Sequence, residues 1–116
     1  MKKSDLEARL VKFAGETIFF SESLPSTSIG THLASQITRS ATRAPLNFSE
    51  VLEAVTDRNA IHECRLTLKE LKETRITLKI LQYVAYGDAA KRDFLLQECE
   101  ALIAITASII KNKQGK

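Results

Sequence analysis

The clearest structural signal in this sequence comes from residues 56–88, TDRNAIHECRLTLKELKETRITLKILQYVAYGD. Apolar residues recur through the stretch at helical spacing, among many charges. They are Leu66, Leu71, Leu78, Leu81 and Val84. Such spacing is typical of a helix with at least one buried face, so the stretch predicts one long helix.

Turn-forming residues are few and lie at the ends of such segments. A first break falls at residues 24–28, LPSTS. Thr56 and Asp57 are both able to cap the start of a helix. Gly87 is a candidate C-cap, and Asp88 is a candidate N-cap for the next helix. These breaks divide the chain into four segments, each of which we predict to be a helix.

The other three segments show a similar repeat. Its members are Leu6, Leu10, Phe13, Thr17 and Phe20 in the first segment; Leu33, Ile37, Ala41, Phe48 and Leu52, less regularly, in the second; and Leu95, Leu102, Ile105, Ile109 and Ile110 in the fourth. Short loops between such helices predict an all-α fold, an antiparallel up-down-up-down four-helix bundle. At 116 residues the chain fits a single domain, residues 1–116, with a disordered tail from about residue 112.

Pro45 lies well inside the second segment. It lacks a backbone N–H and crowds the preceding turn, so the helix either kinks there or breaks into two pieces. We favour a kink, because the helical pattern resumes at once with Asn47, Phe48 and Glu50. A kink frees a carbonyl near residue 41, which nearby polar side chains can satisfy.

Composition excludes several classes of protein. The 17 Lys and Arg against 14 Asp and Glu give a net charge of only +3. The two cysteines, Cys64 and Cys99, form no CxxC motif, and no His lies at ligand spacing, so no metal site is expected. The start of the chain does not resemble an export signal, and no apolar stretch approaches the roughly 20 residues of a membrane helix. We therefore expect a cytoplasmic protein.

Nothing in the sequence indicates catalysis. His32 and His62 are isolated, and neither belongs to a metal-binding or deaminase motif. The cysteines are most simply small buried hydrophobic residues. The 4 glycines form no phosphate-cradling loop. We predict that the protein is not an enzyme and has no cofactor.

A polar stripe runs along the second segment on both sides of Pro45. Its members follow one another at steps of three or four residues: Gln36, Arg39, Arg43, Asn47 and Glu50. The stripe has three interpretations, which are a solvated surface with weak ion pairs, a polar network between helices or subunits, and an anion or nucleic-acid contact through the two arginines. Glu70 and Glu73 of the third segment could join such a network.

The third segment carries the best electrostatic feature of the chain. Five cations fall within an arc of about 80° on a helical wheel: Arg58, Arg65, Lys69, Lys72 and Lys79. The arc is either the solvated face of a bundle helix or a surface that contacts phosphates. No aromatic residue interleaves it, so we expect recognition by charge and shape rather than by base stacking.

The same segment is apolar in more than one direction. Cys64, Leu66, Leu71, Ile76, Leu78 and Leu81 point widely apart on the wheel. One apolar stripe suffices for a monomeric bundle, so a second one predicts self-association.

Residues 36–50, QITRSATRAPLNFSE, resemble the signature of the 23S rRNA intervening-sequence protein family, with its Gln, Arg–small pair, Pro, Asn and Glu in this order. Residues 68–74, LKELKET, resemble a second pattern of that family. The resemblance implies a bacterial four-helix bundle that assembles into rings, typically homopentamers, and whose molecular role is mostly unassigned. A related bundle, the accessory variability determinant of diversity-generating retroelements, binds nucleic acid and a reverse transcriptase.

We therefore predict a non-enzymatic homo-oligomer, in keeping with the implied pentamer, that binds structured RNA or other nucleic acid. The candidate phosphate contacts are Arg39, Arg43, Arg58, Arg65, Lys69, Lys72 and Lys79. The candidate structural polar network is Gln36, Asn47, Glu50, Glu70 and Glu73. Its partners would be copies of itself and RNA, DNA or a nucleic-acid-processing protein. The alternative is a protein–protein scaffold that binds no nucleic acid.

Overall fold

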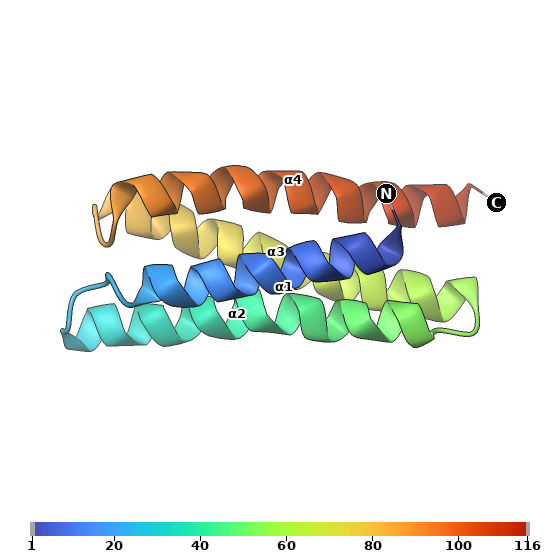
Figure 1. Ribbon diagram of the computed structural model, residues 1–116, viewed down its shortest axis with the longest axis horizontal. Helices are drawn as coiled ribbons and strands as arrows, with labels where there is room; N and C mark the ends of the chain where they lie inside the picture. Colours follow the sequence, from blue (N-terminus) through green and yellow to red (C-terminus); the bar gives the residue numbers. More distant parts are fainter. Residues whose placement is uncertain (1, 116) are drawn as a thin grey trace.

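A computed structural model describes residues 2–115 of the chain. Its elements are α1 (Lys3–Ser21), α2 (Ser28–Glu53), α3 (Asp57–Tyr83) and α4 (Ala89–Gln114), with no strand in the described part (Figure 1). The predicted all-α class is confirmed, and the breaks fall where the turn residues placed them. α4 includes the first residues of the segment that we expected to be disordered.

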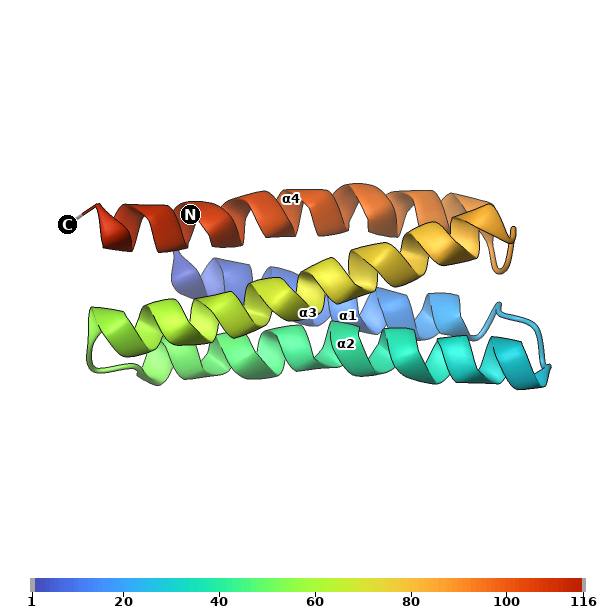
Figure 2. The same cartoon turned by 180° about the vertical axis from the view of Figure 1, so that it is seen from behind.

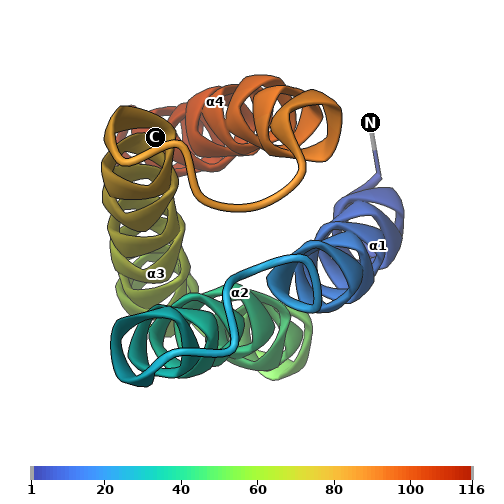
Figure 3. The same ribbon diagram turned by 90° about the vertical axis from the view of Figure 1, so that its left-hand side faces the viewer.

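The helices form an elongated bundle that measures 48 × 20 × 19 Å. Each helix packs on the next one in the chain, and α4 returns to α1. Within residues 2–115 the backbones of α1 and α3 are not neighbours, and the two helices lie on opposite sides of the bundle (Figure 3). The connection from α1 to α2 and that from α3 to α4 lie at one end of the molecule, and residues 54–56 join α2 to α3 at the other (Figures 1 and 2).

The core lies along the axis of the bundle. Its largest fully buried side chains come from all four helices and include Phe13, Phe20, Phe48, Leu10, Ile37, Leu71, Leu78, Leu81, Leu95 and Leu102. Most of the predicted apolar repeat is therefore buried. Leu52 and Val84 are exposed near helix ends, and four other members of the repeat are half-buried: Leu33, Leu66, Ile105 and Ile109. On α3, Leu71 and Leu78 are buried whereas Ile76 is 53% exposed, so the helix has apolar surface outside the core.

Three helix starts carry side-chain caps. The hydroxyl of Thr56 accepts from the backbone N–H of Asn59 at 3.1 Å, and the carboxylate of Asp88 accepts from that of Lys91 at 2.9 Å. Both caps were predicted from the sequence. Thr27 caps α2 in the same way.

The end of α3 differs from our expectation. The helix stops at Tyr83, and Ala85 rather than Gly87 takes the left-handed conformation beside its end, with φ of 56°. The N–H groups of Tyr86 and Ala85 donate to the carbonyls of Leu81 and Gln82 at 3.0 and 3.2 Å, which is the pattern of a Schellman motif. The expected role of Gly87 as the C-cap is therefore wrong.

Gly87 serves the following loop instead. It has φ of +85°, and a Cβ there would lie 2.7 Å from the ring of Phe20. Glycine is required because the loop packs closely on the end of α1.

α2 passes through Pro45 as one continuous helix, so a break into two pieces is excluded. The carbonyl that Pro45 leaves without its usual donor is that of Ala41, one turn earlier. No side chain of residues 2–115 donates to it. The hydroxyl of Thr42, the next residue, donates to the carbonyls of Thr38 and Arg39 at 2.7 and 3.1 Å instead.

Candidate functional site

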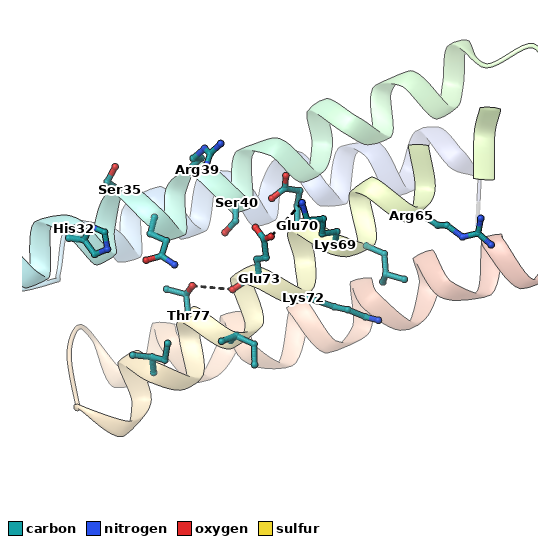
Figure 4. Close-up of a pocket in the computed structure, with 14 residues that line it drawn as sticks. His32, Ser35, Arg39, Ser40, Arg65, Lys69, Glu70, Lys72, Glu73 and Thr77 are labelled. Carbon is teal, nitrogen blue, oxygen red and sulfur yellow. Dashed lines mark hydrogen bonds and ion pairs between the residues drawn. The ribbon is translucent and has the colours of Figure 1, made fainter. Parts of the chain in front are cut away.

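A groove of about 1040 Å³ lies between α2 and α3 (Figure 4). It is lined by His32, Ser35, Gln36, Arg39 and Ser40 of α2 and by Arg65, Leu68, Lys69, Glu70, Lys72, Glu73, Ile76, Thr77 and Ile80 of α3. The two helices pack side by side along the bundle, so residues of the polar stripe and of the basic arc meet here. The sequence predicted both sets separately, and the fold brings part of each into one groove.

The acidic side chains of the groove already have cationic partners. Arg43 donates through Nε to Oε2 of Glu70 at 3.2 Å, across from α2 to α3. Nζ of Lys69 lies 3.9 Å from Oε1 of Glu73, one turn along α3. These ion pairs offset the negative charges of Glu70 and Glu73, the two acidic residues of the groove.

Three cations of the groove have no such partner. Within residues 2–115, Arg39, Arg65 and Lys72 form no ion pair, and all three are exposed. Arg39 comes from α2, whereas Arg65 and Lys72 come from α3 (Figure 4). The groove therefore has an excess of exposed positive charge that an anion could bind.

Glu70 is the one acidic residue that is buried at the floor of the groove, with 8% of its surface exposed. Burial raises the pKa of its carboxyl group, the neighbouring Glu73 raises it further, and Arg43 opposes the shift. Beside it, the hydroxyls of Ser40 and Thr74 lie 2.7 Å apart and join α2 to α3. This floor is a buried polar contact that fixes the two helices relative to each other.

Of the remaining predicted residues, only Gln36 lines the groove. Arg58 and Lys79 are exposed on α3 but do not line it. Of the candidate network, Gln36 lines the groove, whereas the side chains of Asn47 and Glu50 make no hydrogen bond with other described residues. The structure thus joins Glu70 to Arg43 and Glu73 to Lys69.

The sequence analysis named Ile76 as apolar surface of this helix but overlooked Ile80 and Tyr83 on the same face. Ile76 and Ile80 line the groove, and Tyr83, 92% exposed, follows them by one turn. The wheel arithmetic that grouped the basic residues would also have found these three, because they lie within or close to the same arc. The basic arc ends in an apolar patch with one aromatic ring.

A second hollow of about 610 Å³ lies between the start of α1 and the end of α4. Lys2, Lys3 and Lys113 stand around it, and Ile105 and Ile109 form part of its wall. Lys113 is paired with Asp57 at 3.2 Å. This hollow was not anticipated.

Reactive and metal-binding groups are not gathered anywhere in the described chain. Both cysteines are free and buried, and burial raises the pKa of Cys99 to about 12 and also raises that of Cys64, so their thiols stay protonated. No group of three or more His, Cys, Asp or Glu side chains among residues 2–115 could hold a metal ion. None of the helices that the structure describes contains a segment suited to crossing a membrane.

Comparison with known proteins places the chain in a family. A crystal structure of a protein of unknown function from the S23 ribosomal protein family of Bacteroides thetaiotaomicron matches with a TM-score of 0.86. The match covers 96% of this chain and 99% of that one, at 23% sequence identity, and so supports the fold. No curated protein matches the sequence. The family model of the 23S rRNA-intervening sequence protein matches residues 2–108, which bears out the resemblance noted above, and the chain therefore belongs to that family.

Proposed function

We propose that this protein is a non-enzymatic, homo-oligomeric module that binds structured RNA or another nucleic acid through the α2–α3 groove and the basic residues around it. The observation that carries the proposal is the set of exposed cations without partners, Arg39, Arg65 and Lys72, on one hollowed face. The acidic residues of the groove are neutralised within the chain, so the excess charge is available to phosphates.

The binding would be led by charge and shape. Arg39 and Arg65 can each grip a phosphate with two parallel N–H donors, whereas Lys72 acts as a compact positive charge. Each neutralised phosphate releases counterions, so the affinity falls as salt rises. Contacts to phosphates position a nucleic acid without reading its sequence.

The architecture proposed with this function is a single domain, an antiparallel bundle whose second helix bends at Pro45. The proposed place of action is the cytoplasm. Loops at alternate ends of the molecule support the direction of the helices. Two free buried cysteines are in keeping with a reducing compartment. A pentamer is the assembly that the family resemblance implies, and exposed apolar residues such as Ile76 support self-association.

A matched pair of charge reversals tests the nucleic-acid site. Arg65→Glu/Lys72→Glu changes groove residues, and Lys91→Glu/Lys111→Glu changes the net charge equally on α4, outside the groove; all four positions are exposed. Mobility shifts with a generic structured RNA over a series of salt concentrations would measure affinity. We expect the groove variant to bind far more weakly, with a log–log salt slope reduced by about one for each residue removed per copy. An equal effect of the two variants, or no salt-sensitive complex with the unmodified protein, would refute the proposal.

The competing function is a protein–protein scaffold. It is favoured by the exposed apolar residues, among them Phe19, Ile80 and Tyr83. A scaffold would retain its partner after nuclease treatment of a native lysate and at high salt, whereas a nucleic-acid complex would be lost. Affinity capture with and without nuclease separates the two.

A further inference from the structure

One end of α3 presents an apolar surface that its own bundle does not cover. Ile76 and Ile80 are 53% and 44% exposed, and Tyr83 and Val84 extend the surface to the end of the helix. We call these four residues the α3 apolar end. Residues 74–87 around them include Arg75 and Lys79 and contain no Asp or Glu. Arg75 forms an ion pair with Glu100, so Lys79 is the cation of this stretch that has no ion-pair partner within residues 2–115.

A second apolar surface lies on α1. Val11, Ile18 and Phe19 are 57%, 43% and 59% exposed, at steps that keep them on one helix face. Gly15 lies between them, and a Cβ added there would meet nothing within 4 Å, so the stripe has room for a side chain from outside. We call Val11, Gly15, Ile18 and Phe19 the α1 stripe. Residues 13–24 around its far end contain Glu16 and Glu22 and no Lys or Arg.

The two surfaces cannot cover each other within one molecule. Within residues 2–115 the backbones of α1 and α3 are not neighbours, and the two helices lie on opposite sides of the bundle, so their outer faces point away from each other (Figure 3). They can meet only between two copies. Because the surfaces differ, such a contact is heterologous, and repeated contacts of that kind close into a ring when the rotation between copies permits.

The surfaces also lie at the same level along the bundle. The loop after α1 and the loop after α3 pack together, with the N–H of Asp88 donating to Oγ of Ser23 at 2.9 Å. Ile18 and Phe19 therefore lie near the end of the molecule that also holds Ile80 and Tyr83 (Figure 1). When elongated subunits stand side by side around one symmetry axis, with their long axes along it, residues at the same height along that axis meet between neighbouring copies.

From these observations we infer that copies of this chain join head to tail, with the α1 stripe of one copy packed on the α3 apolar end of the next. Apolar surface would meet apolar surface, and Glu16 and Glu22 of one copy would approach Lys79 of its neighbour. The inference rests on the homo-oligomer of the proposed function and specifies the surfaces that form it.

This arrangement divides the α3 face between two tasks. The apolar end, including Ile76 and Ile80 at one end of the groove, is covered by the neighbouring copy. Arg58, Arg65, Lys69 and Lys72 lie farther along α3 and stay open, so only the basic part of the groove is left for phosphates. Lys79 then belongs to the contact between copies rather than to the phosphate contacts. All copies would present their basic residues at the same level of the ring.

Two single variants test the contact. Phe19→Glu disrupts the α1 stripe, and Ile76→Glu disrupts the α3 apolar end. Val55→Glu is the matched control, because Val55 is 95% exposed in the loop between α2 and α3, at the far end of the bundle. All three changes add one negative charge at a position more than half exposed, and circular dichroism would verify that each variant folds. Should either glutamate variant unfold, the milder Phe19→Ser and Ile76→Ser replace it.

Masses would be measured by sedimentation velocity. We expect the unmodified chain and Val55→Glu to be oligomers of equal mass, and Phe19→Glu and Ile76→Glu to be monomers when alone. An equimolar mixture of the two monomeric variants should yield a one-to-one heterodimer, because one intact contact can form between an unmodified α1 stripe and an unmodified α3 apolar end.

Oligomers that survive either glutamate variant would overturn the inference and leave the proposed homo-oligomer standing. Monomers that form no heterodimer on mixing would overturn the head-to-tail arrangement. An unmodified chain that is itself monomeric would overturn both the inference and the proposed assembly, and RNA binding would still be judged by its own salt series.

Discussion

Ala85 holds an unusual backbone conformation at the end of α3. Its φ of 56° is left-handed, which costs a residue with a Cβ roughly 1–2 kcal/mol relative to glycine. We predict that Ala85→Gly raises the free energy of unfolding by about 0.5–1 kcal/mol, after the larger chain entropy of glycine in the unfolded state is subtracted. Urea denaturation at unchanged m-value would measure the gain.

Gly87 provides the opposite test two residues later. Gly87→Ala places a Cβ 2.7 Å from Phe20 at φ of +85°, so we expect a loss of about 1–3 kcal/mol by the same measurement. If Ala85→Gly destabilised the protein, the cost assigned to the left-handed conformation of Ala85 would be wrong.

Because of Glu70, at the floor of the groove, the free energy of unfolding should depend on pH. Its pKa is raised in the folded chain, chiefly by burial, so the folded state holds the carboxyl proton more tightly than the unfolded state does. The stability from that proton is complete below the ordinary pKa of the carboxyl group and is lost as pH rises through the raised value. Above the raised pKa, the ionised Glu70 therefore lowers the free energy of unfolding.

Glu70→Gln keeps an acceptor for Arg43 and removes this titration. We predict that the variant equals or exceeds the unmodified chain in stability at pH 7, and that the difference shrinks as pH falls below the raised pKa. Thermal melts over that range would follow it. Arg43→Gln is the control, since it leaves the buried carboxylate without its cation and should lower stability at pH 7 by about 1 kcal/mol. A difference that grew toward low pH would contradict the sign of the shift.

At the scale of the helix, α2 continues through Pro45 although Pro45 cannot donate to the carbonyl of Ala41. We predict that Pro45→Ala restores this hydrogen bond and raises the free energy of unfolding by about 1–3 kcal/mol. Chemical denaturation would measure the change, with Ser49→Ala, one turn farther along the same helix, as a control expected to change little. A destabilised Pro45→Ala variant would show instead that packing against α1 and α3 depends on the backbone shape that Pro45 imposes.

Helix boundaries and caps could be predicted from the sequence because each is a local property. Thr56 and Asp88 cap their helices as expected, since a short polar side chain before an apolar repeat has one favourable use. The role of Ala85 could not be foreseen. Its left-handed conformation depends on how the loop must turn to pack Gly87 on Phe20, which is a tertiary requirement.

The groove could be predicted only in part. Helical spacing placed Arg65, Lys69 and Lys72 on one face of α3, which needs no tertiary information. Arg43 pairs with Glu70, whereas Arg39 forms no ion pair within residues 2–115. This difference depends on the relative rotation of α2 and α3, which spacing within one helix does not determine. The exposure of Ile76 and Ile80 depends likewise on which face of α3 the bundle leaves uncovered.

At the scale of the whole molecule, the fold separates charge from apolar surface along one helix. The basic part of α3 spans Arg58 to Lys72, about 21 Å at 1.5 Å per residue, and the apolar end occupies the last two turns. A ring built through the apolar ends would bring several weakly basic surfaces together. A chain with a net charge of only +3 per copy could then hold a polyanion that one copy alone would release.

If charge is pooled in this way, the affinity for a long RNA should depend on formation of the oligomer. Phe19→Gln removes an apolar contact of the proposed interface without changing the charge, and every basic residue of the groove stays in place. If several copies grip one RNA together, the monomeric variant should bind a long structured RNA about 100-fold or more weakly than the unmodified protein, and a short hairpin that reaches only one copy about equally well. Fluorescence anisotropy with the two RNAs would give the ratio, and Val55→Gln is the matched control. Equal losses on both RNAs would mean that Phe19 acts on the binding site itself, and no loss on either would mean that one copy suffices.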